Sequence, residues 1–215
     1  MLQRLALVAC ITTLSACAGF SQRGNDADAS LRALYEAEYA WRQVQQGRIK
    51  NDEDQWTTGP ALPSVTPQSY AERLQYWEEA LARLAEIPKD RLSDEEAINA
   101  AVFEQILTSD ASNARYRTYE APLNSDTFFW SYLTARRGFA DIDGYERYIG
   151  RMRDLPRYFS EHMTNMRAGL ARGFTPPAVT LRGRTAILDS YLVEGENNPF
   201  FAPARQFSNR IPIEE

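Results

Sequence analysis

Apolar side chains recur at three- and four-residue spacing along most of the chain, which is the period of one face of an α-helix. Gly47 and Pro88 close the first two of these stripes and Gly173 closes a longer one, because glycine and proline typically end helices. Ser93 and Glu96 form a capping-box pattern that begins another helix. The pattern predicts helices over residues 31–46, 67–87, 94–113, 143–172 with an interruption at Pro156, and 176–192.

Hardly any stretch alternates apolar and polar residues with the period of two that a half-buried strand requires. The connections between the predicted helices are short, apart from the loop 51–67, which is dense in Asp, Gly, Pro and Thr. Short connections place consecutive helices antiparallel. The sequence therefore predicts an all-α fold, an antiparallel helical bundle.

The least regular segment is 116–138, in which aromatic residues follow several turn-forming residues without a helical period. Aromatic side chains beside polar turn residues can line a groove for a peptide or a sugar. In a helical bundle, however, such a cluster usually forms core, and core packing is the favoured interpretation. The candidate substrate-binding residues of this segment are Asn124, Phe128, Phe129 and Trp130.

The first residues have the layout of a bacterial lipoprotein signal peptide. Arg4 precedes an apolar run of about ten residues, which is too short for a hydrocarbon core that needs ~20. The tetrapeptide Leu14–Cys17 (Leu-Ser-Ala-Cys) resembles a lipobox, in which the cysteine thiol receives diacylglycerol before cleavage in front of it. We therefore expect a signal peptide over 1–16 and lipid on Cys17. The alternative is an ordinary secretory signal that is cut nearby.

This signal predicts the domain organisation and the location of the protein. We expect a lipidated polar tether over 17–29 and a helical domain over 30–215. Acyl chains on Cys17 would hold the protein to a membrane, at ~0.8 kcal/mol for each buried methylene. Ala18 follows the cysteine, whereas an Asp at this position tends to retain enteric lipoproteins at the inner membrane. We therefore expect a place in the cell envelope, on the periplasmic face of the outer membrane.

Composition restricts the chemistry of the mature chain. Its two cysteines are Cys10 and Cys17, so processing and lipidation leave no thiol for a disulfide, a metal site or a nucleophile. Removal of 1–16 deletes Arg4 and moves the formal net charge from −5 to −6, which argues against nucleic acid as a partner. His162 is the only histidine, so a His-Glu-x-x-His zinc helix cannot form, and we expect His162 on a helix surface. The residues predict no catalytic group and no metal site.

Four stretches in the second half of the chain carry a family resemblance. They are 119–125 (Tyr-Glu-Ala-Pro-Leu-Asn-Ser), 144–148 (Gly-Tyr-Glu-Arg-Tyr), 155–158 (Leu-Pro-Arg-Tyr) and 165–177. The last contains Met-Arg-x-Gly-x-x-x-Gly-x-x-x-Pro and is the most specific. Together they resemble the amino-terminal portion of a bacterial family catalogued as domain of unknown function 885 (DUF885). The resemblance covers nearly all of the mature chain but only the first part of the family's domain.

The resemblance implies a fold and a chemistry. Family members are usually longer, all-helical, and often secreted or lipidated. Their carboxy-terminal part carries a His-Glu-x-x-x-His or related helix, which makes them similar to zinc metallopeptidases of the thimet oligopeptidase type. None of those ligands has a counterpart here, so no metal-binding or catalytic residue is transferred and zinc is expected only in the full-length family. We therefore expect an incomplete amino-terminal part of a larger helical domain, whose partners are its missing carboxy-terminal helices.

Two classes of function remain open at this point. In the first, the parent protein is a zinc-dependent, peptidase-like hydrolase that acts on a peptide substrate, and this chain supplies helices that frame the cleft. In the second, the chain is a lipid-anchored binding or scaffold module without enzymatic activity. For the chain alone we expect neither tightly bound zinc nor peptidase activity.

Overall fold

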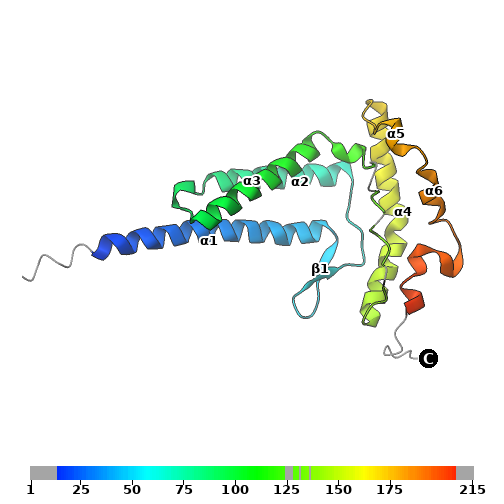
Figure 1. The fold of residues 1–215 in the computed structure, drawn as a ribbon, viewed down its shortest axis with the longest axis horizontal. Coiled ribbons are helices and arrows are strands. Elements are labelled where there is room, and N and C mark those ends of the chain that lie inside the picture. Colours follow the sequence, from blue (N-terminus) through cyan, green and yellow to red (C-terminus); the bar gives the residue numbers. More distant parts are fainter. Residues whose placement is uncertain (1–13, 124–127, 131, 136, 207–215) are drawn as a thin grey trace, which may run out of the picture. The chain divides into compact units, whose positions relative to one another are not determined.

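The structure, a computed structural model, describes residues 14–123, 128–130, 132–135 and 137–206, with side chains from Asp26 onward. It is mostly helical, which confirms the all-α prediction (Figure 1). The described residues divide into two compact units. Unit 1 comprises the chain up to Arg42 together with Glu72–Ser112, and unit 2 comprises Gln43–Ala71 and the chain from Asn113 on. In the part of the chain that is described, no helix is both long and apolar enough to cross a membrane.

Unit 1 is a bundle of helices. It contains most of α1 (Leu14–Gln45), α2 (Pro67–Ala85) and α3 (Asp94–Arg115), with the short 3₁₀ helix η1 (Lys89–Arg91) between α2 and α3. The sequence pattern predicted the last two helices to within a few residues. By contrast, α1 begins well before the predicted start at residue 31 and includes 17–29, the range of the expected tether.

The directions of the helices in unit 1 follow from their contacts. Trp41 near the end of α1 stacks on Tyr76 in the middle of α2, with ring centroids 3.8 Å apart. Leu34, which precedes Trp41 in α1, shares a cavity with Arg83 near the end of α2, so these two helices are antiparallel. Tyr35 of α1 meets Phe103 of α3 at 6.3 Å, and earlier residues of α1 contact the start of α3, so α1 and α3 are parallel. The three helices α1, α2 and α3 therefore form an up–down–up bundle, in which each helix is antiparallel to the one before it.

The start of α3 shows how tertiary contacts modify a cap. Ser93 accepts a hydrogen bond from the backbone N–H of Glu96, as a capping box requires. The Glu96 carboxylate does not return to Ser93, however, because it accepts from Arg32 of α1 at 2.5 Å. The backbone N–H of Ser93 donates instead to Asp28 of α1. Two charged groups of α1 thus complete the cap of α3.

Helix α3 has two apolar faces. Phe103 and Leu107 are buried within unit 1. Ile98, Val102 and Ile106 repeat every four residues on another face and are exposed. Apolar periodicity therefore predicted the helix correctly but did not indicate which face is buried.

Unit 2 begins with a small hairpin that the sequence did not predict. Strands β1 (Arg48–Lys50) and β2 (Trp56–Thr58) pair antiparallel. The side-chain carbonyl of Asn51 accepts hydrogen bonds from the backbone N–H groups of residues 53 and 55, which forms the turn. The loop predicted over 51–67 therefore contains a strand, β2. The sequence pattern did not indicate the strands because three residues per strand are too few to show a period of two.

The central element of unit 2 is α4 (Ile142–Ala171). Its N-cap is Asp141, which accepts from the backbone N–H of Gly144 at 2.7 Å. The predicted interruption at Pro156 is wrong, because α4 continues through it. Proline removes one backbone donor, but Asp154 and Arg157 on either side of it bind the backbone of Leu62, which holds this part of α4 in place. Gly173 has φ +75°, which confirms the predicted glycine at the carboxyl end of the helix.

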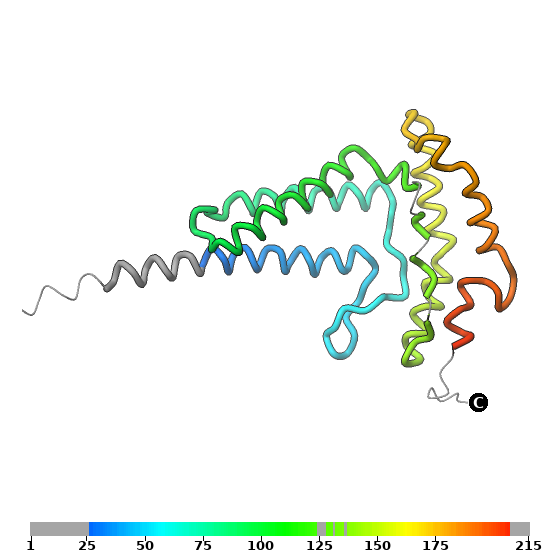
Figure 2. The backbone as a smooth tube through the Cα atoms, in the orientation of Figure 1, coloured from blue at the N-terminus to red at the C-terminus, as the bar shows by residue number. Residues whose placement is uncertain are grey.

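After α4 the chain returns alongside it (Figure 2). Tyr148 donates its hydroxyl to the carbonyl of Phe200 at 2.9 Å, and Tyr145 donates to that of Pro203 at 3.2 Å. The single helix predicted over 176–192 is two short helices, because Gly183 between them has φ +75°. The shorter elements of unit 2 are η2 (Thr118–Glu120), α5 (Ala178–Leu181), α6 (Thr185–Asp189), η3 (Gly195–Asn197), η4 (Pro199–Phe201) and η5 (Ala204–Gln206).

Candidate functional site

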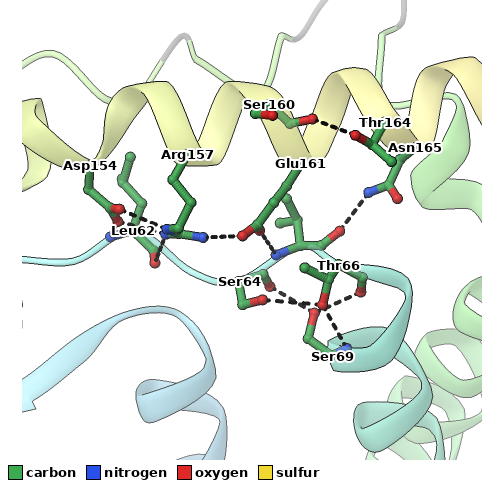
Figure 3. A network of polar contacts seen from close by, with 11 residues as sticks. Leu62, Ser64, Thr66, Ser69, Asp154, Arg157, Ser160, Glu161, Thr164 and Asn165 are labelled. Atoms are coloured by element: carbon green, nitrogen blue, oxygen red, sulfur yellow. Dashed lines mark hydrogen bonds and ion pairs between the residues drawn. The ribbon is translucent and has the colours of Figure 1, made fainter.

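Polar side chains of α4 bind the backbone of an extended segment that contains Leu62 and Val65 (Figure 3). Leu62 donates its N–H to Asp154 at 2.7 Å, and Val65 donates its N–H to Glu161 at 2.8 Å. Asn165 donates to the carbonyl of Val65 at 2.5 Å and is buried. Because this segment lies outside helices and strands, the side chains of α4 replace the backbone partners that secondary structure would supply.

Arg157 joins the carboxylates of this network (Figure 3). Its guanidinium donates to Asp154 at 2.7 and 2.6 Å, to Glu161 at 2.7 Å, and to the carbonyl of Leu62 at 2.8 Å. These hydrogen bonds hold the pKa of Asp154 below and that of Arg157 above the ordinary value. Both carboxylates accept hydrogen bonds from Arg157 and from the backbone of the extended segment, so the network is a structural clamp.

His162 lies inside unit 2, so the prediction of a surface position is wrong. Its side chain is 4% exposed, stacks on Phe129 with ring centroids 3.8 Å apart, and meets the edge of Tyr158 at 4.6 Å. Neither ring nitrogen has a hydrogen-bond partner among the described residues. Burial lowers the pKa of His162 to about 4, and the imidazole is therefore neutral at neutral pH. His162 thus packs as a core aromatic residue against Phe129 and Tyr158.

The residues singled out from the sequence fall in different places. Phe128, Phe129 and Trp130 are buried in the core of unit 2, whereas Asn124 lies outside the described residues. Their assignment to substrate binding stays a prediction. Cys17 falls in the first turns of α1, where the structure describes the backbone and not the side chain, so lipidation also stays a prediction.

The most specific stretch of the family resemblance forms the carboxyl end of α4. Arg172 makes an ion pair with the buried Glu120 of η2. A Cβ on Gly169 would lie 2.7 Å from the carbonyl oxygen of Glu120 and 2.8 Å from that of Phe174, so a larger side chain does not fit there. Glu120 of the first stretch of the resemblance thus contacts Gly169 and Arg172 of the last stretch, and these residues serve the fold.

A small cavity of about 210 Å³ lies beside the first half of α4 in unit 2. Arg147 and Arg151 line it from successive turns of α4, a spacing that places both on one face of the helix. Arg147 is 4.0 Å from Asp141, and Arg151 makes no hydrogen bond or ion pair with any described residue. The other lining residues are Thr57, Thr58, Tyr132, Leu133, Thr134, Ala135, Phe139, Gly144 and Tyr148.

The cavity is electropositive. Among the described residues that line it there is no acidic side chain, and burial lowers the pKa of Arg151 without removing its charge at neutral pH. The hydroxyl of Tyr132 is 3.3 Å from that of Tyr158, and burial raises the pKa of Tyr148. Two arginines and three threonines (Thr57, Thr58 and Thr134) therefore line one small volume, and their guanidinium and hydroxyl groups are donors suited to an anion. The sequence reasoning missed both arginines, because an i, i+4 pair of arginines is common on helix surfaces.

Unit 1 offers a larger but less selective cavity of about 390 Å³. Its lining combines Asp26 and Glu86 with Arg83 and Arg91, so it favours neither sign of charge. Elsewhere in unit 1, burial raises the pKa of Glu38, which lies 3.3 Å from Arg42. Among the residues that the structure describes, no three His, Cys, Asp or Glu side chains are grouped so that they could hold a metal ion.

Comparison with known proteins identifies the family. The sequence model of a family described as "Bacterial protein of unknown function (DUF885)" matches residues 43–214. No curated protein matches the chain, and no solved structure does. The chain belongs to the DUF885 family.

Proposed function

We propose that this DUF885 protein is a lipoprotein of the bacterial cell envelope, acylated on Cys17. The observation that carries the proposal is the tetrapeptide Leu14–Cys17 directly after an apolar run of h-region length. Ala18 in place of Asp favours the periplasmic face of the outer membrane. Lipid on Cys17 would account for the sole cysteine that remains after processing.

For the helical domain we propose a part in peptide binding within a peptidase-like hydrolase. The resemblance to zinc metallopeptidases supports this role, and the electropositive cavity beside α4 suits the carboxylate of a peptide. The described residues do not fit a zinc site, since no three metal-ligating side chains are grouped among them. No catalytic step is therefore assigned to this chain. The same cavity also favours the second candidate, a binding module without catalysis, since its described lining has two arginines and no carboxylate or histidine that could act as a base.

Metabolic labelling tests the lipid anchor. Cells that express the full chain are fed an alkynyl fatty acid, and the purified protein is examined for label. Wild type is expected to carry label, and Cys17→Ser to lose it, since no other thiol follows the cleavage site. Cys10→Ser is the matched control and retains label, because Cys10 lies in the removed peptide. Unlabelled wild type, or labelled Cys17→Ser, contradicts lipidation.

Membrane fractionation tests the location. On a density gradient the wild-type protein is expected with outer-membrane markers. Ala18→Asp, which installs the retention residue, is expected to move to inner-membrane fractions. A wild-type protein in the inner membrane contradicts the proposed location and leaves the lipid anchor intact.

Two observations separate the hydrolase from the binding module. The reading frame beyond codon 215 in the source genome is expected to continue into a His-Glu helix if the first is correct, whereas a stop codon there favours the second. The purified 215-residue chain is expected to leave quenched fluorescent peptides uncleaved with or without added zinc. Cleavage by this chain contradicts the assignment of catalysis to residues outside it.

A further inference from the structure

We propose that the cavity beside α4 in unit 2 is a binding site for the carboxylate group of a small molecule, held by Arg147 and Arg151. The inference rests on the binding role proposed above for this cavity and narrows its ligand, and it depends neither on lipid anchoring nor on hydrolysis. It assigns a ligand chemistry to residues for which the family resemblance implies no role.

Helix α4 supplies two cations to the lining of the cavity. Arg147 and Arg151 are four residues apart on α4 and line the same cavity. The lining also includes Thr57 and Thr58 of β2, whose hydroxyls can donate hydrogen bonds. A guanidinium presents a fork of N–H donors that matches the two oxygens of a carboxylate.

The charge balance favours an added anion. Arg151 is half-buried and makes no ion pair with any described residue. The carboxylate of Asp154 acts on the pKa of Arg151, but its oxygens already accept from Arg157 and from the backbone of Leu62. A partly desolvated cation without a partner costs free energy, and a carboxylate in the cavity would offset that cost.

The size of the cavity limits the ligand. About 210 Å³ is below the ~300–1,000 Å³ of sites for drug-sized molecules. Leu133 and Phe139 provide apolar surface in the same lining. The site therefore suits a carboxylate with one small apolar group, as in an acylated amino acid or at the carboxyl end of a peptide.

Binding to paired probes tests the inference. The full chain, purified in a non-ionic detergent, is titrated by calorimetry and by ligand-observed NMR with N-acetylalanine and with its neutral amide. The acid is expected to bind, and the amide to bind at least tenfold more weakly. Trialanine as free acid and as amide forms the second arm, which tells a peptide end from a small free acid. Inorganic phosphate is the third probe.

Substitutions locate the binding. Arg151→Gln and Arg147→Gln are each expected to weaken binding of the acid at least tenfold. Arg153→Gln is the matched control, because Arg153 is exposed on the same helix and does not line the cavity. Circular dichroism and thermal melts of each variant establish that it is folded. For a variant that does not fold, transferred-NOE contacts between the bound acid and the ring of Tyr148 in wild type give the location instead.

Four results overturn the inference. They are equal binding of acid and amide, binding of phosphate without binding of either acid, unchanged binding by folded Arg151→Gln, and absence of binding by every probe. Failure of the lipidation or peptidase experiments leaves this inference untouched, since none of its measurements depends on them.

Discussion

The two units of this protein differ in how their buried segments are held together. In unit 1 the buried side chains come from apolar stripes on regular helices, and Leu31 and Leu107 are 0% exposed. In unit 2 a single long helix, α4, packs against segments that lie largely outside regular structure. There, polar side chains such as Asp154 and Asn165 bind individual backbone groups of the neighbouring segment.

The difference follows from where backbone groups find their partners. A helix satisfies its own N–H and C=O groups, so two helices need only matching apolar faces to pack. An extended segment outside a sheet has unpaired groups, and each needs a partner when it is buried. Unit 1 therefore depends on apolar volume, and unit 2 depends in addition on specific hydrogen bonds.

The largest expected effect is in unit 1. Leu107→Ala removes most of a fully buried side chain and leaves a cavity, so we expect a loss of about 2–5 kcal/mol in the free energy of unfolding. Urea denaturation followed by circular dichroism measures it. A loss below about 1 kcal/mol would mean that the bundle relaxes around the cavity and does not depend on apolar volume at this position.

The second effect is a pH dependence in unit 2. The pKa of His162 is about 4 in the folded protein and 6.5 without burial, so between these values the unfolded chain binds more protons than the folded one. The contribution of His162 to the free energy of unfolding is therefore fully present above pH 6.5 and decreases as the pH drops toward 4. At ~1.4 kcal/mol for each pKa unit, we expect a total decrease of about 3 kcal/mol.

Comparison with His162→Phe isolates this contribution, because the chain has no other histidine. The variant keeps an aromatic ring against Phe129 and is expected to lack the histidine-dependent loss. Denaturation curves at pH 7, 5.5 and 4 measure the difference between the two proteins. A difference that does not change with pH would show that His162 is not buried as a neutral ring.

The third effect tests the directional hydrogen bonds of unit 2. Asn165→Ala leaves the buried carbonyl of Val65 without its donor, and we expect a loss of about 1–3 kcal/mol in the free energy of unfolding. Thr164→Ala is the matched control on the same helix, since Thr164 is exposed and donates to Ser160 of α4 itself. Equal losses in the two variants would contradict the role of the clamp.

The smallest effect is expected on the exposed face of α3. Val102 is 55% exposed, and Val102→Ala is expected to change the free energy of unfolding by no more than about 0.5 kcal/mol. Together with Leu107→Ala, the same urea experiment compares two apolar faces of one helix. A loss above 1 kcal/mol would show that Val102 is covered in solution, and sedimentation analysis would then identify self-association.

Three residues show which features could be predicted from the sequence alone and which could not. Gly173 ends α4 as predicted, because a left-handed backbone conformation is a local property of glycine. Pro156 was expected to interrupt the helix and does not, because the clamp around Arg157 holds that part of α4. His162 was expected at the surface because its sequence neighbours do not reveal the ring of Phe129, thirty-three positions away.

The sequence by itself determined the helical periods, most helix ends, the family, and the presence of a lipobox-like tetrapeptide at Cys17. These features depend on the order of near neighbours along the chain. Only the tertiary structure decided which face of α3 is buried, that Glu96 pairs with Arg32, and that Arg147 and Arg151 share a cavity with β2. The reason is physical: burial, ion pairing and cavity shape arise from contacts between residues far apart in the sequence, and no local pattern encodes them.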